Sequence, residues 1–336
     1  MSANRTLTLP SLKNKKVLIT GGLGFIGSNL AHKCLELGAA VTIFDCLDPN
    51  SGGNLYNIND IKSDIELRLH DILNFDRLAE CIIDKDILFN CAASTSHPFS
   101  MREPWLNLDA NSRGVINLLE AARRYNRTIR FIHIGTTTQL GKLHYQPADE
   151  SHPEFPTDIY SANKCASEKY ALIYWSAHRI PITVVRLPNV FGPRAAIHSS
   201  DFTFNNFFVG LALQNREITV YGEGNQLRNV LYVNDAINAL VCAAQNDNAI
   251  GETFFAVADD HYSVAQTAKL TVEHIGLGSV RFIEWPRDRQ SIEIGDAVIS
   301  NRKIRETLDW APAYDLAAGL AETRDYFASC LNNYLR

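Results

Sequence analysis

The sequence lacks the features that mark a membrane or secreted protein. It contains no run of about 18 apolar residues, so no transmembrane helix is predicted. The opening segment MSANRTLTLPSLKNKK has no apolar core, which argues against a secretory signal peptide. We therefore expect a cytoplasmic protein with no membrane partner.

Metal-binding and disulfide patterns are also missing. The seven cysteines include no CxxC pair, and the ten histidines show no HExxH or similar spacing. Most of the cysteines lie in apolar contexts such as FNCAA, and their number is odd. We expect free thiols in a reducing compartment and predict no metal site.

An excess of positive charge is absent as well. The chain has 32 Lys and Arg against 37 Asp and Glu, a formal net charge of −5. Nucleic acid and anionic membranes bind basic surfaces, so neither is expected as the main partner. Its 336 residues, 46% of them hydrophobic and 21% charged, suit a globular chain with a large core. A few placed arginines would have to hold any small anionic substrate.

The first half of the chain alternates short apolar runs with helical patterns, and we predict strands over 16–20, 40–45, 65–72, 86–93, 129–138 and 182–190. Apolar strands separated by helices predict an α/β fold with a Rossmann-type doubly wound parallel sheet. The pattern changes near residue 190, which indicates a smaller mixed α/β C-terminal domain. We assign a nucleotide-binding domain to 12–188, with 229–258 returning to it, and a substrate domain to 189–228 and 259–336.

A glycine-rich turn follows the first predicted strand. The segment LITGGLGFIG places Gly21, Gly24 and Gly27 between a strand and a helix that opens with Phe25 and Ile26. Glycine permits a tight turn, backbone approach to a pyrophosphate and close helix–strand packing, and the helix N-terminus offers free N–H groups. A plain strand–helix turn is the alternative. The context favours a dinucleotide site that includes all five residues.

Acidic residues at strand ends indicate which dinucleotide binds. Asp45 ends the second predicted strand, where a carboxylate bonds the adenosine ribose hydroxyls and repels a 2′-phosphate. No arginine follows it within ten residues, so NAD is favoured over NADP. Asp71 and Ile72, after the third strand, are expected to flank the adenine.

A tyrosine and a lysine lie one helical turn apart in DIYSANK. Tyr160 and Lys164 have the i, i+4 spacing of side chains on one face of a helix. A tyrosine with its ordinary pKa near 10 is a poor base at neutral pH, but a nearby ammonium favours the phenolate. The pair is a candidate general base for a carbinol O–H whose C–H hydrogen leaves to NAD.

Taken together, the ordered motifs resemble those of a known family. TGGLGFIG, FNCAAS, YSANK, RLPNVFGPR and LDWAPAYDLAAGLAET are similar to motifs of the extended short-chain dehydrogenase/reductases. Within that superfamily they resemble the NAD-dependent nucleotide-sugar epimerase/dehydratase family, which includes the UDP-glucose 4-epimerases. The resemblance spans residues 15–328. It implies an enzyme acting on a nucleoside-diphosphate sugar, and a homodimer formed through the helices carrying GVINLLEAA and Tyr160.

The resemblance also implies a third catalytic residue. A serine or threonine at the end of the fifth strand completes the family's triad, and counting five back from Gly141 gives Thr136. The usual motif ends in valine-tyrosine-glycine, whereas Gln-Leu stands at 139–140 here. Thr137 or Thr138 is left open as a residue that shares the role. Ordinary strand threonines are the alternative.

The same segment narrows the expected chemistry. Family 4,6-dehydratases carry an aspartate and a glutamate where Thr137 and Thr138 stand, and related decarboxylases often carry a glutamate at the second position. A threonine does not act as a carboxylate base at neutral pH. We therefore expect 4-epimerisation of a UDP-sugar. Another nucleotide-sugar reaction (4-keto reduction, 4,6-dehydration or decarboxylation), a reductase of another substrate and a nucleotide-sensing protein remain as alternatives.

Further contacts follow from the resemblance alone. Cofactor contacts are expected from Ala92, Ala93 and Asn111, and substrate contacts from Ser100, Thr137, Asn189, Asn206, Arg228 and Arg289. Arg287 is a rival for Arg289, and Phe207 joins Asn206 as a candidate for the nucleobase pocket. Thr95, His97 and the 195–205 loop are expected to shape the sugar pocket.

Overall fold

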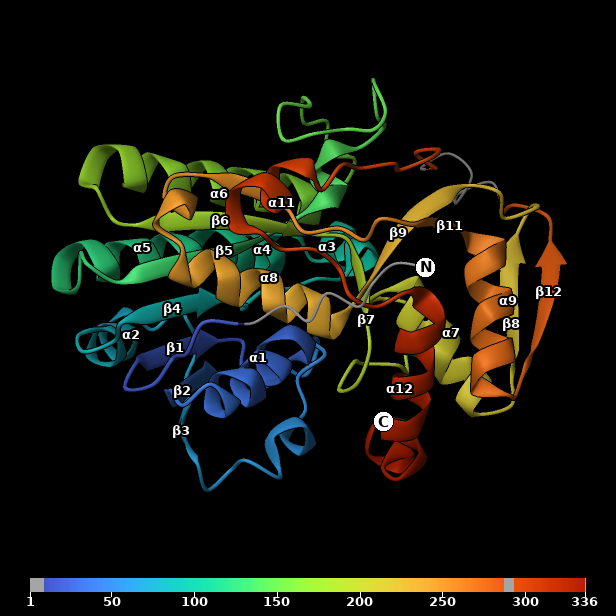
Figure 1. Ribbon diagram of the computed structural model, residues 1–336, viewed down its shortest axis with the longest axis horizontal. Coiled ribbons are helices and arrows are strands. Elements are labelled where there is room, and N and C mark those ends of the chain that lie inside the picture. The colour runs from blue at the N-terminus through green and yellow to red at the C-terminus, as the bar shows by residue number, and fades with distance from the viewer. Residues whose placement is uncertain (1–8, 287–292, 336) are drawn as a thin grey trace.

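The computed structural model describes residues 9–286 and 293–335. Its main layer is a parallel seven-stranded sheet (Figure 1). The strands, in order across the sheet, are β10 (Thr253–Phe255), β6 (Ile182–Leu187), β5 (Arg130–Thr136), β4 (Ile87–Asn90), β1 (Lys16–Thr20), β2 (Ala40–Asp45) and β3 (Ile65–Leu69). The order reverses direction between β1 and β4, and crevices at such switch points bind ligands in open α/β sheets.

Helices cover both faces of this sheet. The covering helices are α1 (Phe25–Glu36) and α8 (Val233–Gln245) on one face, and α2 (Phe75–Ile82), α5 (Gly114–Tyr125) and α6 (Ile159–His178) on the other. Val17 and Ile19 pack into the core on the α1 side, whereas Leu18 packs into the core on the α5 side. Alternate residues of a strand point to opposite faces, so a continuously apolar strand suits a sheet covered twice. The predicted Rossmann-type fold is confirmed.

A smaller α/β part lies beside the sheet, at the right of Figure 1. One three-stranded sheet has the order β11–β9–β7, and β12 pairs with β8. The other α-helices and strands of the described residues are α3 (His97–Arg102), α4 (Pro104–Leu108), β7 (Asn189–Phe191), α7 (Phe204–Leu213), β8 (Glu217–Tyr221), β9 (Leu227–Tyr232), β11 (His261–Ser263), α9 (Val264–Ile275), β12 (Ser279–Ile283), α11 (Arg302–Leu308) and α12 (Leu316–Ala328).

Two strands differ from the expectation. The segment 182–190 was expected to form one strand, but β6 ends before Pro188 and β7 begins after it in another sheet. Proline has no N–H for the ladder, which explains the break. Within 229–258, α8 and β10 return to the main sheet while β9 pairs with β7 and β11. The boundaries between the two domains stay a prediction.

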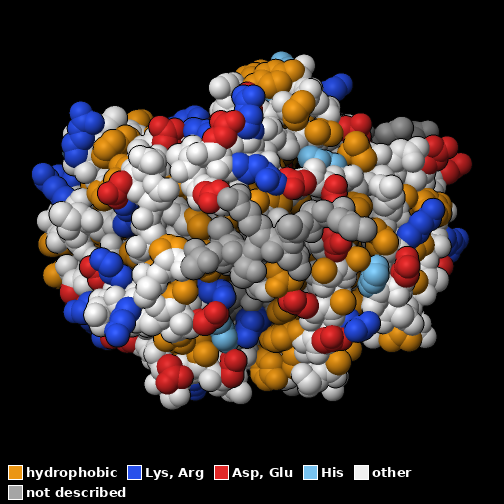
Figure 2. Space-filling view, viewed as in Figure 1, with side chains coloured by type: hydrophobic (Ala, Val, Ile, Leu, Met, Phe, Trp, Pro, Cys, Tyr) orange, Lys and Arg blue, Asp and Glu red, His pale blue; other side chains and the backbone are white. Residues whose placement is uncertain are grey.

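The surface and the thiols agree with an ordinary globular chain. On the face shown in Figure 2, acidic and basic side chains are interspersed. None of the helices in 9–286 and 293–335 is long and apolar enough to cross a membrane. All seven cysteines are free thiols, as expected, although Cys46 is exposed.

Candidate active site

The glycine turn between β1 and α1 is closely packed. Gly21 has φ of +68°, and a Cβ added there would lie 2.6 Å from the Ala92 nitrogen at the end of β4. A Cβ on Gly27 would lie 2.2 Å from the Gly21 carbonyl oxygen. These distances are shorter than any ordinary contact, so both positions require glycine. The turn therefore lies directly against the β4 end, at the point where the strand order reverses.

The N-terminus of α1 is open to a ligand. Gly24 occupies the N-cap position, and no side chain caps the helix there. The first-turn N–H groups, which include those of Phe25 and Ile26, have no partner inside a helix. Such groups and the helix dipole favour an anion. The turn and helix start thus fit a dinucleotide pyrophosphate.

Asp45 connects β2 to the glycine turn. Its Oδ2 accepts a hydrogen bond from the Leu23 N–H at 2.9 Å, and its Oδ1 accepts one from the Leu47 N–H at 2.7 Å. Burial raises the pKa of Asp45, and these backbone donors oppose the rise. Each carboxylate oxygen keeps a second lone pair, so the side chain is able to accept ribose hydroxyls as well.

The loop after β4 is held by two buried asparagines. Asn111 accepts from the Ser94 N–H at 3.2 Å and donates to the Ser94 carbonyl at 2.8 Å. Asn107 donates to the same carbonyl at 3.0 Å. Ala92 and Ala93 stand just before Ser94, beside the glycine turn, and are partly exposed. Asn111 in this structure fixes the loop that follows these two alanines, and its own contact with NAD stays a prediction.

The two residues expected near the adenine lie beyond the end of β3. Asp71 is exposed, and its Oδ1 accepts from the Leu73 N–H at 2.8 Å. Ile72 is buried against Gly114, at the start of α5, where an added Cβ would lie 2.3 Å from the isoleucine side chain. Their contact with an adenine is a prediction that rests on sequence position.

The three expected catalytic residues come from β5 and α6. Thr136 ends β5, while Tyr160 and Lys164 lie in the first two turns of α6. All three are buried, and the Tyr160 residue is 8% exposed. Burial raises the pKa of Tyr160 to about 12, and a hydrogen bond from Thr136 opposes the rise. The structure therefore brings Thr136 and Tyr160 together.

Lys164 is buried, and burial disfavours the charged form of its side chain. Burial lowers the pKa of its ammonium to about 8, and the Glu168 carboxylate one turn further on opposes the fall. The Nζ donates a hydrogen bond to the Ile134 carbonyl of β5. The lysine thus links α6 to the catalytic strand. Its effect on Tyr160 stays a prediction.

The threonines after Thr136 form a short helical turn, η3 (Thr137–Leu140). Thr136 caps this turn by accepting from the Thr138 N–H at 3.3 Å, and the two hydroxyls are 3.0 Å apart. Thr138 is therefore part of the hydroxyl cluster around Tyr160. Thr137 is half-buried, and its expected contact with substrate stays a prediction.

Ser100 lies behind Tyr160. Its hydroxyl accepts from the Tyr160 backbone N–H at 3.1 Å and donates to the His97 carbonyl at 2.7 Å. The residue is fully buried. In this structure Ser100 holds the start of α6, and its expected contact with substrate stays a prediction.

Three of the expected substrate residues, Asn189, Arg228 and Asn206, lie on β7, β9 and α7. Asn189 pairs with Val230, so it stands diagonally across from Arg228 on the neighbouring strand. The Arg228 guanidinium donates to Glu293 and to the Gly295 carbonyl, both at 2.6 Å. A phosphate would have to share or replace these acceptors.

Asn206 is buried at the start of α7. Its Nδ2 donates to the Val190 carbonyl at 3.0 Å and to the Thr203 hydroxyl at 2.7 Å. Within the described chain its Oδ1 has no hydrogen-bond partner, although the atom is buried. That oxygen remains an acceptor for a ligand N–H. Arg289 and its rival Arg287 lie outside the described residues.

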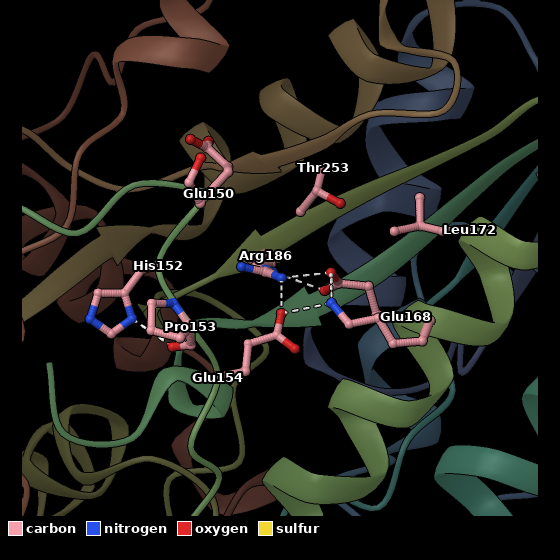
Figure 3. Close-up of a pocket in the computed structure, with 10 residues that line it drawn as sticks. Glu150, His152, Pro153, Glu154, Glu168, Leu172, Arg186 and Thr253 are labelled. Carbon is pink, nitrogen blue, oxygen red and sulfur yellow. Dashed lines mark hydrogen bonds and ion pairs between the residues drawn. The ribbon is translucent and has the colours of Figure 1, made fainter. Parts of the chain in front are cut away.

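The structure explains the unusual Gln139. This buried side chain donates to Glu154 at 3.1 Å and to Glu168 at 2.9 Å. Arg186, on β6, bonds the same two carboxylates, and Figure 3 shows it joined to both by dashed lines. We call Gln139, Glu154, Glu168 and Arg186 the carboxylate clamp. It joins η3, the loop before α6, α6 itself and β6.

The carboxylate clamp is a buried ionic cluster with imperfect pairing. Arg186 and Glu168 are 2% and 1% exposed, and the Arg186 Nη1 is buried without a partner among the described residues. A cavity of about 370 Å³ lies over the clamp. Its lining includes Glu150 and Thr253 but none of the three catalytic residues. The cavity is therefore separate from the candidate active site.

Sequence reasoning missed the clamp for a physical reason. Its members lie on four segments, and no fixed spacing links Gln139 with Glu154 or Arg186. The one readable signal is Glu168, which stands four residues after Lys164 and so shares its helix face.

The tight glycine turn generates a first prediction. Replacing Gly27 with alanine places a methyl group 2.2 Å from the Gly21 carbonyl oxygen, so the turn must open. We expect NAD affinity to fall about tenfold or more, which corresponds to about 1.4 kcal/mol. Calorimetric titration of NAD checks this, with circular dichroism to show that the variant is folded. A folded variant with unchanged affinity would contradict the role of the turn.

The carboxylate clamp generates a second prediction. Arg186→Met leaves the buried Glu168 without its arginine, with the half-exposed Lys169 at 3.6 Å as the remaining cation. Breaking a buried ion pair in this way typically costs about 3–5 kcal/mol of unfolding free energy. Arg281→Met is the matched control, because that arginine is 66% exposed and pairs with Glu217 at 3.6 Å. Its loss should cost less than about 1 kcal/mol. Denaturant unfolding of both variants measures the difference, and equal losses would show that the clamp contributes no special stability.

Comparison with known proteins agrees with this geometry. The model of the NAD dependent epimerase/dehydratase family matches residues 17–258. UDP-glucuronic acid decarboxylase 1 of Xenopus tropicalis is 30% identical over 319 residues, which span 93% of this chain and 72% of the relative. A putative UDP-glucose 4-epimerase of Methanocaldococcus jannaschii is 29% identical over 90% of this chain and 95% of its own.

The fold also resembles that of solved nucleotide-sugar epimerases. The crystal structure of UDP-glucose 4-epimerase from Thermotoga maritima superposes with a TM-score of 0.85 at 26% identity, over 94% of this chain and 99% of that one. Relatives with different reactions thus share one scaffold, and the residues that fit NAD here lie where the family's motifs place them. The chain is an enzyme of the NAD-dependent epimerase/dehydratase family, and its cofactor is NAD.

Proposed function

We propose that this enzyme is a 4-epimerase of a UDP-sugar. The sugar 4-hydroxyl would lie against Thr136 and Tyr160, whose side chains are adjacent at the end of β5 and the start of α6. Tyr160 takes the proton of that hydroxyl and later returns it. Bound NAD supplies the acceptor and then the donor for the hydrogen at C4. Rotation of the 4-keto sugar between the two steps inverts the carbon.

The electrostatics of the triad suit a tyrosine that both gains and loses a proton. Burial raises the pKa of Tyr160 to about 12, so the phenol is neutral in the resting protein. A positive charge nearby lowers such a pKa. Lys164 supplies that charge when it is protonated, and its own pKa of about 8 keeps it so at neutral pH. The hydroxyl of Thr136 steadies the phenolate by donating to it.

One observation carries the choice of reaction: the side chains of segment 136–138 next to Tyr160 are hydroxyls. Thr136 and Thr138 lie 3.0 Å apart, where elimination or decarboxylation would call for a carboxylate base. The two glutamates of the carboxylate clamp, Glu154 and Glu168, already form ion pairs with Arg186. Reversible hydride transfer at C4 of the sugar needs no base besides Tyr160.

The substrate half supports a nucleoside diphosphate. A guanidinium fork matches phosphate geometry, and Arg228 stands near Asn189 on adjacent strands. We propose that the diphosphate takes over Arg228 from Glu293 and that the free Oδ1 of Asn206 accepts a base N–H. We propose that the sugar binds beside His97. The His97 ring packs against the Tyr160 ring with centroids 4.8 Å apart.

A second reaction on the same substrate class has support of its own. The relative at 30% identity is named as a UDP-glucuronic acid decarboxylase. A 4-keto sugar is a common first product for decarboxylation, 4,6-dehydration and 4-epimerisation, and Tyr160 with Lys164 would serve each. The hydroxyls at 136 and 138 favour epimerisation over these alternatives.

We also propose a homodimer through α5 and α6. Both helices carry exposed apolar side chains, with Ile116 at 37% and Ile173 at 56% exposure. Apolar side chains on adjacent helices suit a symmetric helix-packed interface.

The reaction is tested by offering the NAD-loaded enzyme a panel of UDP-, dTDP- and GDP-sugars. We expect interconversion of C4 epimers of a UDP-sugar, detected by chromatography and proton NMR. Release of CO₂ from UDP-glucuronic acid, or a 4-keto-6-deoxy product, would contradict epimerisation and establish the alternative.

The catalytic tyrosine is tested with Tyr160→Phe. The change removes one hydroxyl from a buried ring, so the fold and NAD affinity should be unchanged. Acid–base groups contribute about 10²–10⁴-fold, and we expect a fall in kcat of that size. Initial rates and NAD titration measure the two quantities. Wild-type turnover in this variant would refute the mechanism.

A further inference from the structure

A chain of hydroxyl groups leads away from Tyr160. Thr136 lies close enough to the phenol to lower its pKa. The Thr136 and Thr138 hydroxyls are 3.0 Å apart, and the Ser161 hydroxyl is 3.0 Å from Thr138. Ser161 is also 3.1 Å from the Asp158 Oδ2. Three hydroxyls thus join the buried phenol to a carboxylate.

The far end of the chain reaches partly exposed groups. The Asp158 side chain is 15% exposed, and its Oδ2 lies 2.7 Å from the His97 Nδ1, whose side chain is 37% exposed. Burial acts to raise the pKa of Asp158, but the hydrogen bond and charge of His97 prevail and hold it below its ordinary value. Asp158 therefore releases a proton readily.

The backbone holds this chain in place. Asp158 is the N-cap of α6, where its Oδ1 accepts from the Ser161 N–H at 2.8 Å. The Ser100 hydroxyl bridges the Tyr160 N–H and the His97 carbonyl, so α3 and α6 are joined at the same point. The segment that positions the catalytic tyrosine thus also positions the hydroxyls.

We propose that Thr136, Thr138 and Ser161 carry the proton of Tyr160 to Asp158 and from there to solvent. The inference rests on the proposed role of Tyr160 as the acid–base group. A hydroxyl both donates and accepts, so each one is able to pass a proton on.

The proton balance of the path is simple. The Tyr160 O–H bond breaks and an O–H forms on Thr136, while Thr136 and Thr138 each pass their own proton one place along. Ser161 gives its proton to the Asp158 carboxylate, and water takes it from there. One proton leaves, a phenolate remains, and no electrons are transferred to another group.

Burial is the reason that Tyr160 requires such a path. The residue is 8% exposed, and a sugar and cofactor bound beside it would cover it further. Of the titratable groups around the site, Lys164 bonds the Ile134 carbonyl, Glu168 bonds Arg186, and the His97 ring packs against the Tyr160 ring with centroids 4.8 Å apart. The hydroxyl chain is therefore the route by which Tyr160 reaches its ionised state in the loaded enzyme.

Ser161→Ala tests the path by removing its middle hydroxyl. In the NAD-loaded protein labelled with ¹³C-tyrosine, NMR in mixed light and heavy water reports how fast the Tyr160 hydroxyl exchanges, with Tyr160→Phe identifying the signal. We expect exchange to slow by about tenfold or more. A fall in kcat of about tenfold should follow, smaller than the loss of the acid–base group itself.

The pH profile separates a proton path from a packing effect. Hydroxide removes the phenol proton without the path, so the deficit in kcat should shrink as pH rises. KM and NAD affinity should not change. A packing defect would instead lower kcat by the same factor at every pH.

Matched variants complete the test. Ser161→Thr restores a hydroxyl and should restore exchange. Ser176→Ala, on the same helix with its hydroxyl donating to the Ile173 carbonyl, should behave as wild type. Because water can fill the space of a lost hydroxyl, Asp158→Asn is the second test: it keeps an N-cap acceptor but takes up no proton.

The outcomes distinguish this inference from the proposed function. Wild-type exchange in both Ser161→Ala and Asp158→Asn, with Tyr160→Phe inactive, would overturn the path alone. Turnover by Tyr160→Phe would overturn the proposed function. Slow exchange in both variants, reversed by Ser161→Thr, would establish the path.

Discussion

The site depends above all on how α6 is held against the end of β5. The strand supplies Thr136 and the helix supplies Tyr160 and Lys164, so a small shift of the helix would separate the hydroxyl from the phenol. Besides Ser100 and the bond from Lys164 to β5, two sets of polar contacts fix the helix. Ser161 bonds Thr138 at its start, and Glu168 in its third turn bonds Gln139 and Arg186. Both sets reach the short turn η3, directly after the catalytic strand.

The threonine-rich turn η3 contributes both to the hydroxyl cluster and to the carboxylate clamp. Thr138 extends the hydroxyl cluster outward, while Gln139 is buried and donates to the two carboxylates that also bind Arg186. Buried charges are tolerated only when paired and hydrogen-bonded, so an apolar residue at 139 would leave the clamp short of a donor. The departure from the family's valine is thus explained by Glu154 and Glu168 nearby.

Much of the fold could be predicted from the sequence, because it follows from local rules. Apolar runs separated by helical patterns predicted the parallel sheet, and glycines required by close contacts mark the turn at Gly21 and Gly27. The i, i+4 spacing placed Tyr160 and Lys164 on one helix. The break at Pro188 also follows from a local rule, the missing N–H, but the apolar run on both sides concealed it.

The rest of the site depends on contacts between distant segments. Nothing in the spacing of Gln139, Arg186 and Glu154 indicates that they meet, and the hydroxyl path to Asp158 joins η3 with the start of α6. Ser100 and Arg228 were singled out by position alone. In this structure Ser100 supports α6 and Arg228 binds Glu293, and their contacts with substrate stay predictions.

The central claim is that hydrogen leaves C4 of the sugar and returns to C4 on the other face. The most direct measurement is the fate of deuterium placed at C4 of a UDP-sugar that the NAD-loaded enzyme converts. The account predicts a product with the C4 configuration inverted and the deuterium still on C4. Deuterium found at C6 or released to water, or a product whose C4 configuration is unchanged, would contradict it.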